Sequence, residues 1–371
     1  MESIVIKVGS STLTQGTKKL SRRYMLRLAE EIAALRDRGI RICLVSSGAI
    51  IAGRSLLDHP KVDRTLPSKQ MFAAIGQTNL MQLWSDMFAI FDIHVGQVLL
   101  TRDDFSSRKR FLNARDTLNC LLQHKILPII NENDTVATQE IRVGDNDNLA
   151  ALVSNLVGAS HLILLTDQEG LYTKDPRFHK DAELIPLVKK VDKSIFALAG
   201  VSGTKLGTGG MITKIEAAKI ASESGIKTII ANADHPHVLR DIVNGKKIGT
   251  LFLEEISAKE SRKRWILSDK RQGVITVDKG AAKKILNEGA SLLPSGILCT
   301  SDPFERGACV EIKPEGEDAI AIGMSNYSST DIHHLIGKHS ADIEDILGYS
   351  YGQEIIHRSN MTRIKEKEAS S

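Results

Sequence analysis

The sequence lacks several features that would place the chain in a specialised class of protein. Its four cysteines form no CxxC pair and lie among apolar neighbours, which predicts buried thiols in a reducing compartment. No apolar run approaches the ~18 residues needed to cross a bilayer, so no membrane partner is expected. The first ten residues, MESIVIKVGS, do not have the basic and apolar regions of a secretory signal. These absences predict a cytoplasmic protein.

The chain also lacks a strong excess of charge of either sign. Lysine and arginine together number 49, and aspartate and glutamate number 45, which leaves a net charge of +4. Bulk charge therefore predicts no polyanionic partner, and a nucleic-acid site would need a local basic patch. Apolar residues make up 42% and charged residues 25% of the 371. This is the mixture of a globular protein that buries its core without disulfide or metal staples.

Strand and helix patterns alternate through the first two-thirds of the sequence. Short apolar, β-branched runs predict strands over residues 4–8, 40–45, 95–100, 126–130, 162–165 and 228–231. Helical spacing predicts helices over residues 21–38, 68–91, 108–124 and 211–224, with Ser21 as an N-cap and Gly39 as a C-cap glycine. Several strands are apolar on both faces, which is typical of a parallel sheet covered by helices on both sides. We therefore predict a three-layer αβα domain with a mainly parallel sheet over residues 1–255.

The pattern changes near residue 255. A basic linker, or the rim of an interface, is predicted over residues 256–271, because residues 259–273 carry six basic and two acidic side chains. Beyond it, the short apolar runs ITVD, ILCT, CVEI and AIAIG predict strands, with one helix near residues 281–288. This pattern indicates a small β-rich domain over residues 272–352. A polar tail over residues 353–371 is expected to fray at its end.

Two lysines near glycines mark candidate phosphate-binding positions. Lys7 closes the first predicted strand and precedes Gly9, so its ammonium can point over the sheet edge where the backbone approaches a phosphate closely. The run GTGGMITK, residues 207–214, opens a helix whose free N–H groups and positive dipole end attract phosphate. It fits neither GxxxxGK[ST] nor GxGxxG, so P-loop and Rossmann sites are excluded. An exposed lysine before a turn and a flexible hinge are the alternatives.

Three further polar clusters follow strands of the same predicted sheet. Residues 46–49 (SSGA) could form a nest of N–H donors or only a tight turn. Residues 131–134 (NEND) and 144–148 (GDNDN) follow the strand ILPII and could hold an ammonium, a lysine or a metal, or form a solvated acidic turn. GDNDN lacks the glutamate that completes a calcium loop. Thr166 and Asp167 end LILL, so all these clusters lie where open α/β sheets bind ligands.

The combined set of side chains suits phosphoryl transfer. That reaction needs charge neutralisation and in-line positioning more than covalent chemistry by the protein. A lysine on each side of the transferred group would stabilise its spreading negative charge. The candidate site contains no histidine, since His94, His124 and His161 flank strands and are expected to be structural.

These residues resemble those of the amino acid kinase family, and the resemblance runs almost from end to end. It is carried by IVIKVGSS, VSSGAI, FLNARDTL, INENDTVAT, VGDNDNLAALV, LLTDQEGLYT, LGTGGMITK and RKRWIL. The C-terminal part resembles a PUA domain, a module that often binds RNA in other proteins, through ITVDKGAAKKIL, GASLLPSGI, FERGACVEI and SADIEDILGYSYG. The whole chain is most similar to family members that phosphorylate the γ-carboxylate of L-glutamate with ATP, the first step of proline synthesis.

The resemblance implies a role for each matching residue. Lys7 and Lys214 would neutralise phosphate charge, and Asp147 would arrange the lysines or the substrate. The positions that would bind glutamate are Ser47, Asp134 and Asn146. The positions that would bind ATP are Lys7, Thr166, Asp167, Thr208, Gly209, Gly210, Met211, Ile212, Thr213 and Lys214.

The resemblance also implies cofactors and partners. ATP and Mg²⁺ are expected, with the metal carried by the ATP phosphates and no metal site made by the protein alone. Proline is expected as an inhibitor, and the chain is expected to form a homodimer or tetramer. No reductase domain follows, so the labile acyl phosphate is expected to pass to a separate glutamate-5-semialdehyde dehydrogenase.

Two alternatives remain open from the residues. The same fold could phosphorylate aspartate, acetylglutamate, carbamate or a nucleoside monophosphate, and residues 131–148 would decide among these acceptors. The C-terminal domain could bind RNA through a basic cluster with one tryptophan, made of Arg262, Lys263, Arg264, Trp265, Lys270 and Arg271. An interdomain or oligomer interface is the alternative explanation of that cluster.

Overall fold

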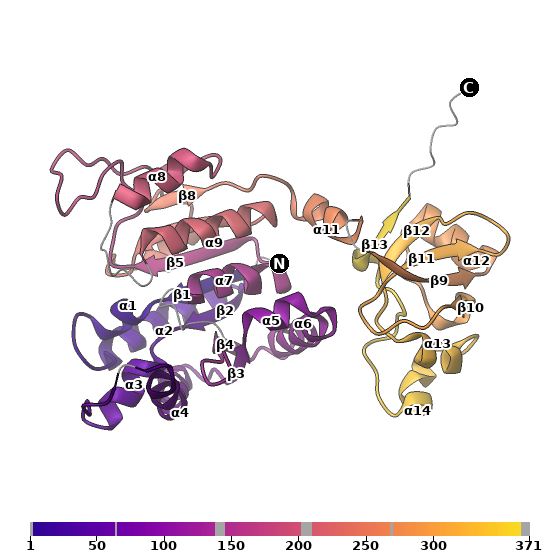
Figure 1. The fold of residues 1–371 in the computed structure, drawn as a ribbon, viewed down its shortest axis with the longest axis horizontal. Helices are drawn as coiled ribbons and strands as arrows, with labels where there is room; N and C mark the ends of the chain where they lie inside the picture. The colour runs from indigo at the N-terminus through magenta and orange to yellow at the C-terminus, as the bar shows by residue number, and fades with distance from the viewer. Residues whose placement is uncertain (1–2, 64, 138–144, 202–209, 268–269, 365–371) are drawn as a thin grey trace. The chain divides into compact units, whose positions relative to one another are not determined.

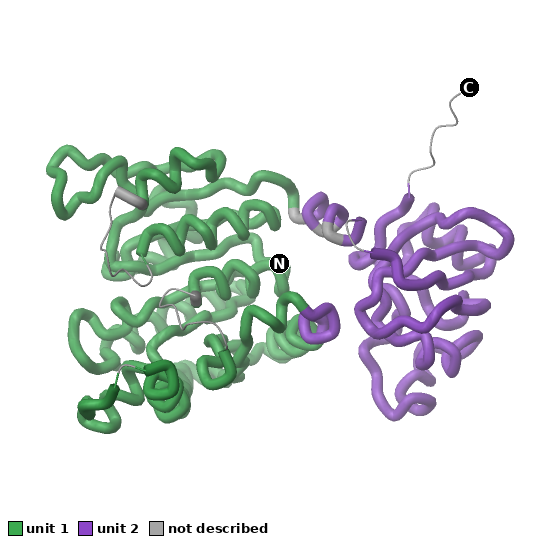
Figure 2. The backbone as a smooth tube through the Cα atoms, in the orientation of Figure 1, with its two compact units in different colours: residues 1–106, 113–258 green, residues 107–112, 259–371 purple. Residues whose placement is uncertain are grey.

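A computed structural model describes residues 3–63, 65–137, 145–201, 210–267 and 270–364. The chain divides into two compact units, which Figures 1 and 2 show. Unit 1 comprises residues 1–106 and 113–258, and unit 2 comprises residues 107–112 and 259–371. Within the described ranges, no helix has both the length and the apolar character needed to span a membrane.

Unit 1 is built on a sheet whose described strands run in the order β3-β4-β2-β1-β5-β7-β8-β6. The strands are β1 (Ser3–Val8), β2 (Arg41–Ser46), β3 (Val95–Leu100), β4 (Leu127–Glu132), β5 (His161–Thr166), β6 (Leu187–Val188), β7 (Lys227–Asn232) and β8 (Thr250–Phe252). All neighbouring pairs are parallel except β7 and β8, which are antiparallel. The mainly parallel sheet predicted from the sequence is therefore confirmed.

Helices cover both faces of this sheet. They are α1 (Ser10–Thr14), α2 (Arg22–Asp37), α3 (Ala49–Leu56), α4 (Leu66–Ala89), α5 (Arg102–Ser106), α6 (Arg108–Gln123), α7 (Asp145–Leu156), α8 (Lys193–Val201), α9 (Met211–Glu223) and α10 (Val238–Val243). Alternate β1 residues face opposite sides. Ile4, Ile6 and Val8 share a buried cluster with apolar residues of α2, α4 and α10. The opposite face of β1 carries Lys7, which pairs with Asp147 of α7, and Lys214 of α9 pairs with the same carboxylate.

Local signals in the sequence explain where these elements begin and end. All six residues of β1 are buried, Lys7 among them. The Ser21 side chain accepts a hydrogen bond from the Tyr24 backbone N–H at the start of α2, and Gly39 follows that helix with φ +81°. A helix often ends on such a left-handed glycine because it carries no Cβ. Both predicted caps are confirmed.

Helices α3 and α4 pack backbone against backbone. A Cβ atom on Gly76 would lie 1.8 Å from the Ala49 carbonyl oxygen, and one on Gly53 would lie 2.0 Å from the Phe72 carbonyl oxygen. Only glycine permits this approach. The Trp84 indole, further along α4, donates a 2.8 Å hydrogen bond to Ser46 Oγ at the end of β2. The sheet and these contacts fix the position of α4 beside the ends of β2 and β4.

Unit 2 contains a second sheet, with its described strands in the order β10-β9-β11-β12-β13. The strands are β9 (Arg271–Val277), β10 (Ile297–Ser301), β11 (Cys309–Pro314), β12 (Ala321–Met324) and β13 (Met361–Arg363). The helices of this unit are α11 (Ala258–Leu267), α12 (Lys279–Lys283), α13 (Ser329–Leu335) and α14 (Ile343–Leu347), with 3₁₀ turns at Pro294–Gly296, Ser340–Asp342 and Arg358–Asn360. Its core is separate from that of unit 1. The small β-rich C-terminal domain is confirmed.

Three features of unit 2 differ in detail from the sequence pattern. The predicted polar tail over residues 353–371 contains the buried core residues Ile355 and Ile356 and strand β13, which pairs with β12, so the domain extends past residue 352. The helix expected near residues 281–288 begins as α12 and continues as a π-helical turn over Lys284–Glu288. The stretch predicted as a basic linker contains helix α11. The many charged residues of this stretch show no strong apolar face, which is why the sequence predicts a linker. In the structure, Ile266 of this helix is buried against Cys309 of β11 and Ile322 of β12.

Candidate active site

The polar clusters of the sequence converge on the carboxyl edge of the unit 1 sheet. Lys7 lies near the end of β1 and Ser46 ends β2, in direct register with Val8. Glu132 ends β4 and Thr166 ends β5. The three histidines named above lie elsewhere: His161 starts β5, and His94 and His124 precede β3 and β4 at the amino edge. The carboxyl edge is therefore the candidate site.

The centre of the site is a buried carboxylate between two buried lysines. Lys7 Nζ lies 2.6 Å from Asp147 Oδ1, and Lys214 Nζ lies 3.1 Å from Asp147 Oδ2. The exposed fraction of each of the three residues is 6% or less. Two cations and one anion leave this group with a net charge of +1. A buried excess of positive charge favours the binding of an anion.

The charges of this group perturb one another. Burial alone would raise the pKa of Asp147, but the positive charges of Lys7 and Lys214 outweigh burial and hold that pKa at about 2. Burial lowers the pKa of Lys7, while the charge of Asp147 opposes that change. Asp147 is therefore ionised at neutral pH and keeps the two ammonium groups close together.

The start of α9 provides a second feature suited to an anion. Its N-cap residue, Gly210, is extended and exposed and gives no side-chain hydrogen bond to the first turn. Thr213 Oγ1 lies 2.7 Å from Asp147 Oδ2 and 2.9 Å from the Gly210 carbonyl oxygen. Met211 is half-buried and Ile212 is exposed. Thr208 and Gly209 lie outside the described residues.

An amide network extends from the lysines toward β4. Asn146 Nδ2 donates to Ser47 Oγ at 2.7 Å and to Asn131 Oδ1 at 2.9 Å. The Glu132 backbone N–H donates to Asn131 Oδ1 at 2.9 Å. Asn131 Nδ2 in turn donates to Gln77 Oε1 of α4 at 2.8 Å. The predicted residues Ser47 and Asn146 are therefore in contact, and Asn146 adjoins Asp147 in the chain.

A cavity of about 270 Å³ lies at the far end of this network. It is lined by Ala73, Ala74, Gln77, Thr78, Gln97, Leu99, Glu132, Asn133, Asp134 and Thr135. Asp134, predicted from the sequence, is among them. Gln77 and Gln97 were missed, because a glutamine within a helix or strand pattern carries no local signal of a site. Only the packing of α4 over β3 and β4 reveals them.

Two predicted residues lie on the other side of β1. Thr166 Oγ1 donates to Asp167 Oδ1 at 3.0 Å, just past the end of β5. Beside them, Asn232 at the end of β7 donates to Glu169 Oε1 at 2.8 Å. The carboxyl edge thus has a polar region on each side of the lysines, one at β4 and one at β5 and β7.

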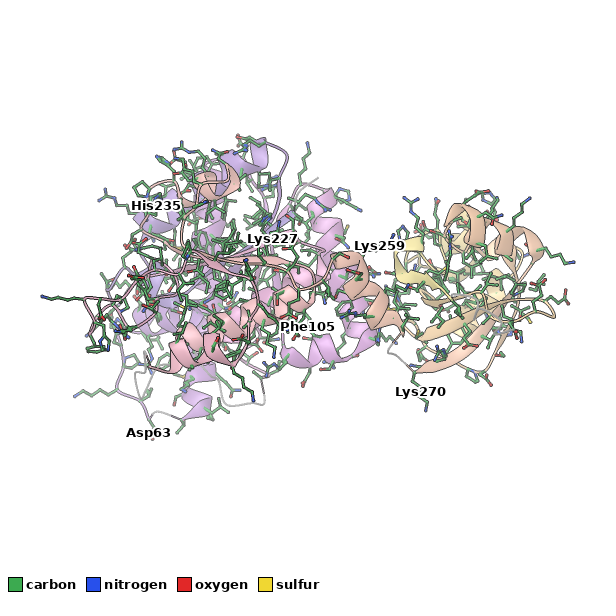
Figure 3. The ribbon with its side chains drawn as sticks, turned by 90° about the horizontal axis from the view of Figure 1, so that it is seen from above. Asp63, Phe105, Lys227, His235, Lys259 and Lys270 are labelled. Carbon is green, nitrogen blue, oxygen red and sulfur yellow. The ribbon has the colours of Figure 1, made fainter. Side chains whose placement is uncertain are left out.

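The basic cluster of unit 2 is described in part. Lys263 and Arg264 are exposed on α11, and Figure 3 labels Lys259 in the same helix and Lys270 just before β9. Arg271 Nε lies 3.1 Å from Glu311 Oε1. The side chains of Arg262 and Trp265 lie outside the described residues.

Comparisons with known proteins agree with this arrangement. Residues 2–232 match the amino acid kinase family, and residues 273–347 match the PUA domain. Glutamate 5-kinase from Pasteurella multocida (strain Pm70) is 51% identical over 97% of this chain and 98% of its own length. Glutamate 5-kinases from Haemophilus influenzae (strain PittGG) and Escherichia coli O1:K1 are 51% and 50% identical over the same shares. Among solved structures, a UMP kinase from Bacillus anthracis aligns with a TM-score of 0.48 and 16% identity, over 69% of this chain and 97% of that one.

Proposed function

Because the chain belongs to the amino acid kinase family and, within it, to the glutamate 5-kinases, we propose that it transfers the γ-phosphoryl group of ATP to the γ-carboxylate of L-glutamate. The products are L-glutamyl 5-phosphate and ADP. The observation that carries the proposal is the buried pair of lysines held by Asp147 beside the Ser47–Asn146 contact.

In this proposal, Lys7 and Lys214 stabilise the charge that spreads over the transferred phosphoryl group. Two ammonium groups in a buried, preorganised position are worth far more there than in water. Thr166, Asp167 and residues 208–214 bind ATP, with the uncapped start of α9 facing the phosphates. Asp147 positions both lysines, because each of its oxygens meets one of them.

The acceptor needs no general base. A glutamate γ-carboxylate, with a reference pKa of about 4.3, is already ionised at neutral pH. One of its oxygens attacks the γ-phosphorus of ATP, the bond to the bridging oxygen breaks, and ADP leaves with the bonding electrons. Ser47 and Asn146 orient the acceptor, and Asp134 holds its α-ammonium by charge-assisted hydrogen bonding.

Magnesium completes the substrate in this proposal. No group of three or more His, Cys, Asp or Glu side chains suited to a metal occurs among the residues that the structure describes. Phosphate oxygens and water usually supply most Mg²⁺ ligands in kinases. We therefore propose that the ion binds through the ATP phosphates, where it would neutralise part of their charge.

Trapping with hydroxylamine tests the reaction directly. Hydroxylamine attacks the acyl carbon of an acyl phosphate, releases phosphate and leaves a hydroxamate. With ATP and Mg²⁺ we expect hydroxamate from L-glutamate and at most traces from aspartate or N-acetylglutamate, which lacks the α-ammonium. A folded enzyme that makes hydroxamate only from another acceptor would overturn the glutamate assignment.

We also propose that the product enters proline synthesis and that proline inhibits the enzyme. Proline keeps an ammonium and a carboxylate on its α-carbon but has no γ-carboxylate to phosphorylate. It can therefore occupy the amino-acid end of the site without reacting. L-proline in the hydroxamate assay is expected to raise the apparent KM for glutamate and to leave kcat unchanged at saturating glutamate. A fall in kcat alone would contradict a shared site.

The remaining proposals concern location and partners. We place the enzyme in the cytoplasm, where ATP and glutamate are supplied, as a dimer or tetramer, which light scattering would measure. Its labile product passes to glutamate-5-semialdehyde dehydrogenase, and co-purification or channelling assays that show no handover would argue for free diffusion instead. RNA binding by the PUA domain stays a prediction, tested by the steep loss of affinity with salt that phosphate contacts produce.

A further inference from the structure

A buried amide supports the contact between Ser47 and Asn146. Asn131, near the end of β4, has an exposed fraction of 2%, whereas Ser47 and Asn146 are half-buried. Asn146 Nδ2 lies 2.9 Å from Asn131 Oδ1 and 2.7 Å from Ser47 Oγ, so the Asn146 amide joins the other two residues. Buried hydrogen-bond networks rigidify the residues that they join. Asn131 is therefore placed to fix the geometry of the two more exposed residues.

The direction of each bond in this network follows from one backbone group. The Glu132 N–H can only donate, so the Asn131 atom 2.9 Å from it and the Asn146 atom 3.3 Å from it are both oxygens. The nitrogen of the Asn146 amide then faces Asn131 Oδ1 and Ser47 Oγ and donates to both. The nitrogen of Asn131 donates in turn to Gln77 Oε1 at 2.8 Å. The Asn131 amide is thus held at both ends.

The backbone groups and the hydroxyl oxygen of Ser47 are already engaged. Its N–H donates to the Val8 carbonyl at 3.1 Å, and its carbonyl accepts from Ser46 Oγ at 3.0 Å. Its Oγ accepts from Asn146 Nδ2, so the hydroxyl proton points away from that amide. Because Val8 follows Lys7 in β1, this proton can be donated to an anion that binds beside the lysine.

We propose that Asn131 is a positioning residue, which fixes the Asn146 amide so that the Ser47 hydroxyl donates to the carboxylate that is phosphorylated. This inference rests on the proposed function, since it assumes that the acceptor carboxylate lies beside Lys7. If the Asn146 amide turned over, its oxygen would face Ser47 and draw the hydroxyl proton away from the acceptor. Asn131 Oδ1 opposes that turn, because two amide oxygens would then face each other.

A double-mutant cycle tests whether Asn131 acts through Asn146. The readout is kcat/KM for L-glutamate, measured by hydroxamate formation with ATP and Mg²⁺. We expect Asn131→Ala to lower it about 10-fold, because a small misplacement of a binding group can cost up to about 100-fold. In an Asn146→Ala background no amide is left to fix, so the same substitution should cost less than about 3-fold. Equal losses in the two backgrounds would give Asn131 a packing role only and overturn the proposal.

Because Asn131 is buried, a second cycle leaves that position unchanged. Ser47→Ala and Asn146→Ala alter half-buried side chains, and each should lower kcat/KM by about 10-fold or more. Together they should cost clearly less than the product of the two single losses, since the Asn146 amide then has no hydroxyl to direct. Losses that multiply in full would mean that Asn146 does not act on Ser47, and the proposal would fall.

A matched control and the wild type complete the test. Asn155→Ala removes an exposed amide from the same helix as Asn146 and should leave kcat/KM unchanged in every background. The Tm of each variant reports whether it is folded. A wild-type enzyme that gives no hydroxamate from glutamate would overturn the proposed function, whereas an active wild type with the cycles above failing would overturn the role of Asn131 alone.

Discussion

Lys214→Ala is expected to lower kcat by about 100- to 1,000-fold while the chain stays folded. One preorganised charge or donor aimed at a transition state is typically worth about 10²–10³ in rate. Lys214 is one of only two cations around Asp147 in the described residues, so its loss removes half of the proposed charge neutralisation. Lys7 remains 2.6 Å from Asp147, so the buried carboxylate keeps a counter-ion and the fold should survive.

The measurement is kcat and KM by hydroxamate formation, with the circular dichroism spectrum and Tm as checks of folding. Lys219→Ala is the matched control, because Lys219 lies on the same helix with a half-exposed side chain and only a weak contact with Glu223. That variant should keep wild-type rates. A folded Lys214→Ala enzyme with near-normal kcat would remove Lys214 from the catalytic mechanism.

Much of this site could be predicted because strand ends and helix starts carry local signals. Lys7 lies near the end of an otherwise apolar strand, and Lys214 lies in the first turn of a helix that follows a glycine-rich run, so both are expected at one edge of the sheet. The pairing of both lysines with Asp147 could not be predicted from spacing alone. It depends on how α7 and α9 pack against each other over the sheet.

Other parts of the structure depend on contacts that no local pattern encodes. β6 and β8 have two and three residues, too few for an alternating pattern to be visible; β8 pairs with the edge of β7, and β6 pairs with β8. Gln77 is equally hidden, since its place on the cavity lining follows from the packing of α4 over β3 and β4. The charged sequence of α11 hides a buried anchor in the same way, at Ile266. In each case the tertiary neighbour supplies the information.

Asp147→Asn is expected to lower the free energy of unfolding of unit 1 by about 3–5 kcal/mol. The substitution keeps the shape and the hydrogen bond to Thr213 but removes the carboxylate charge that faces both lysines. Lys7 and Lys214 then lose the carboxylate that they share inside the protein, and breaking a buried ion pair by removing one partner typically costs this much. Activity should also fall, because repulsion drives the two ammonium groups apart.

The pH dependence of stability distinguishes this charge effect from a general loss of packing. The pKa of Asp147 is about 2 in the folded chain, and about 3.9 when unfolded. Between these values the unfolded state binds more protons, so the carboxylate contributes about 3 kcal/mol that is complete above roughly pH 5 and is lost as the pH falls through 2. The wild type should lose this amount on acidification, and Asp147→Asn should not.

At alkaline pH we expect the stability of Asp147→Asn, rather than that of the wild type, to change with pH. Without Asp147, burial and repulsion from Lys214 should lower the pKa of Lys7 further, so the unfolded state again binds more protons and the variant should gain stability as the pH rises toward 10. Urea unfolding followed by Trp84 fluorescence, in a Trp265→Phe background, reports on unit 1 at each pH. Parallel stability curves for the two proteins from pH 3 to 10 would mean that Asp147 contributes shape and not charge. The two lysines would then need another source of compensation, and the mechanism built on their buried charge would have to be revised.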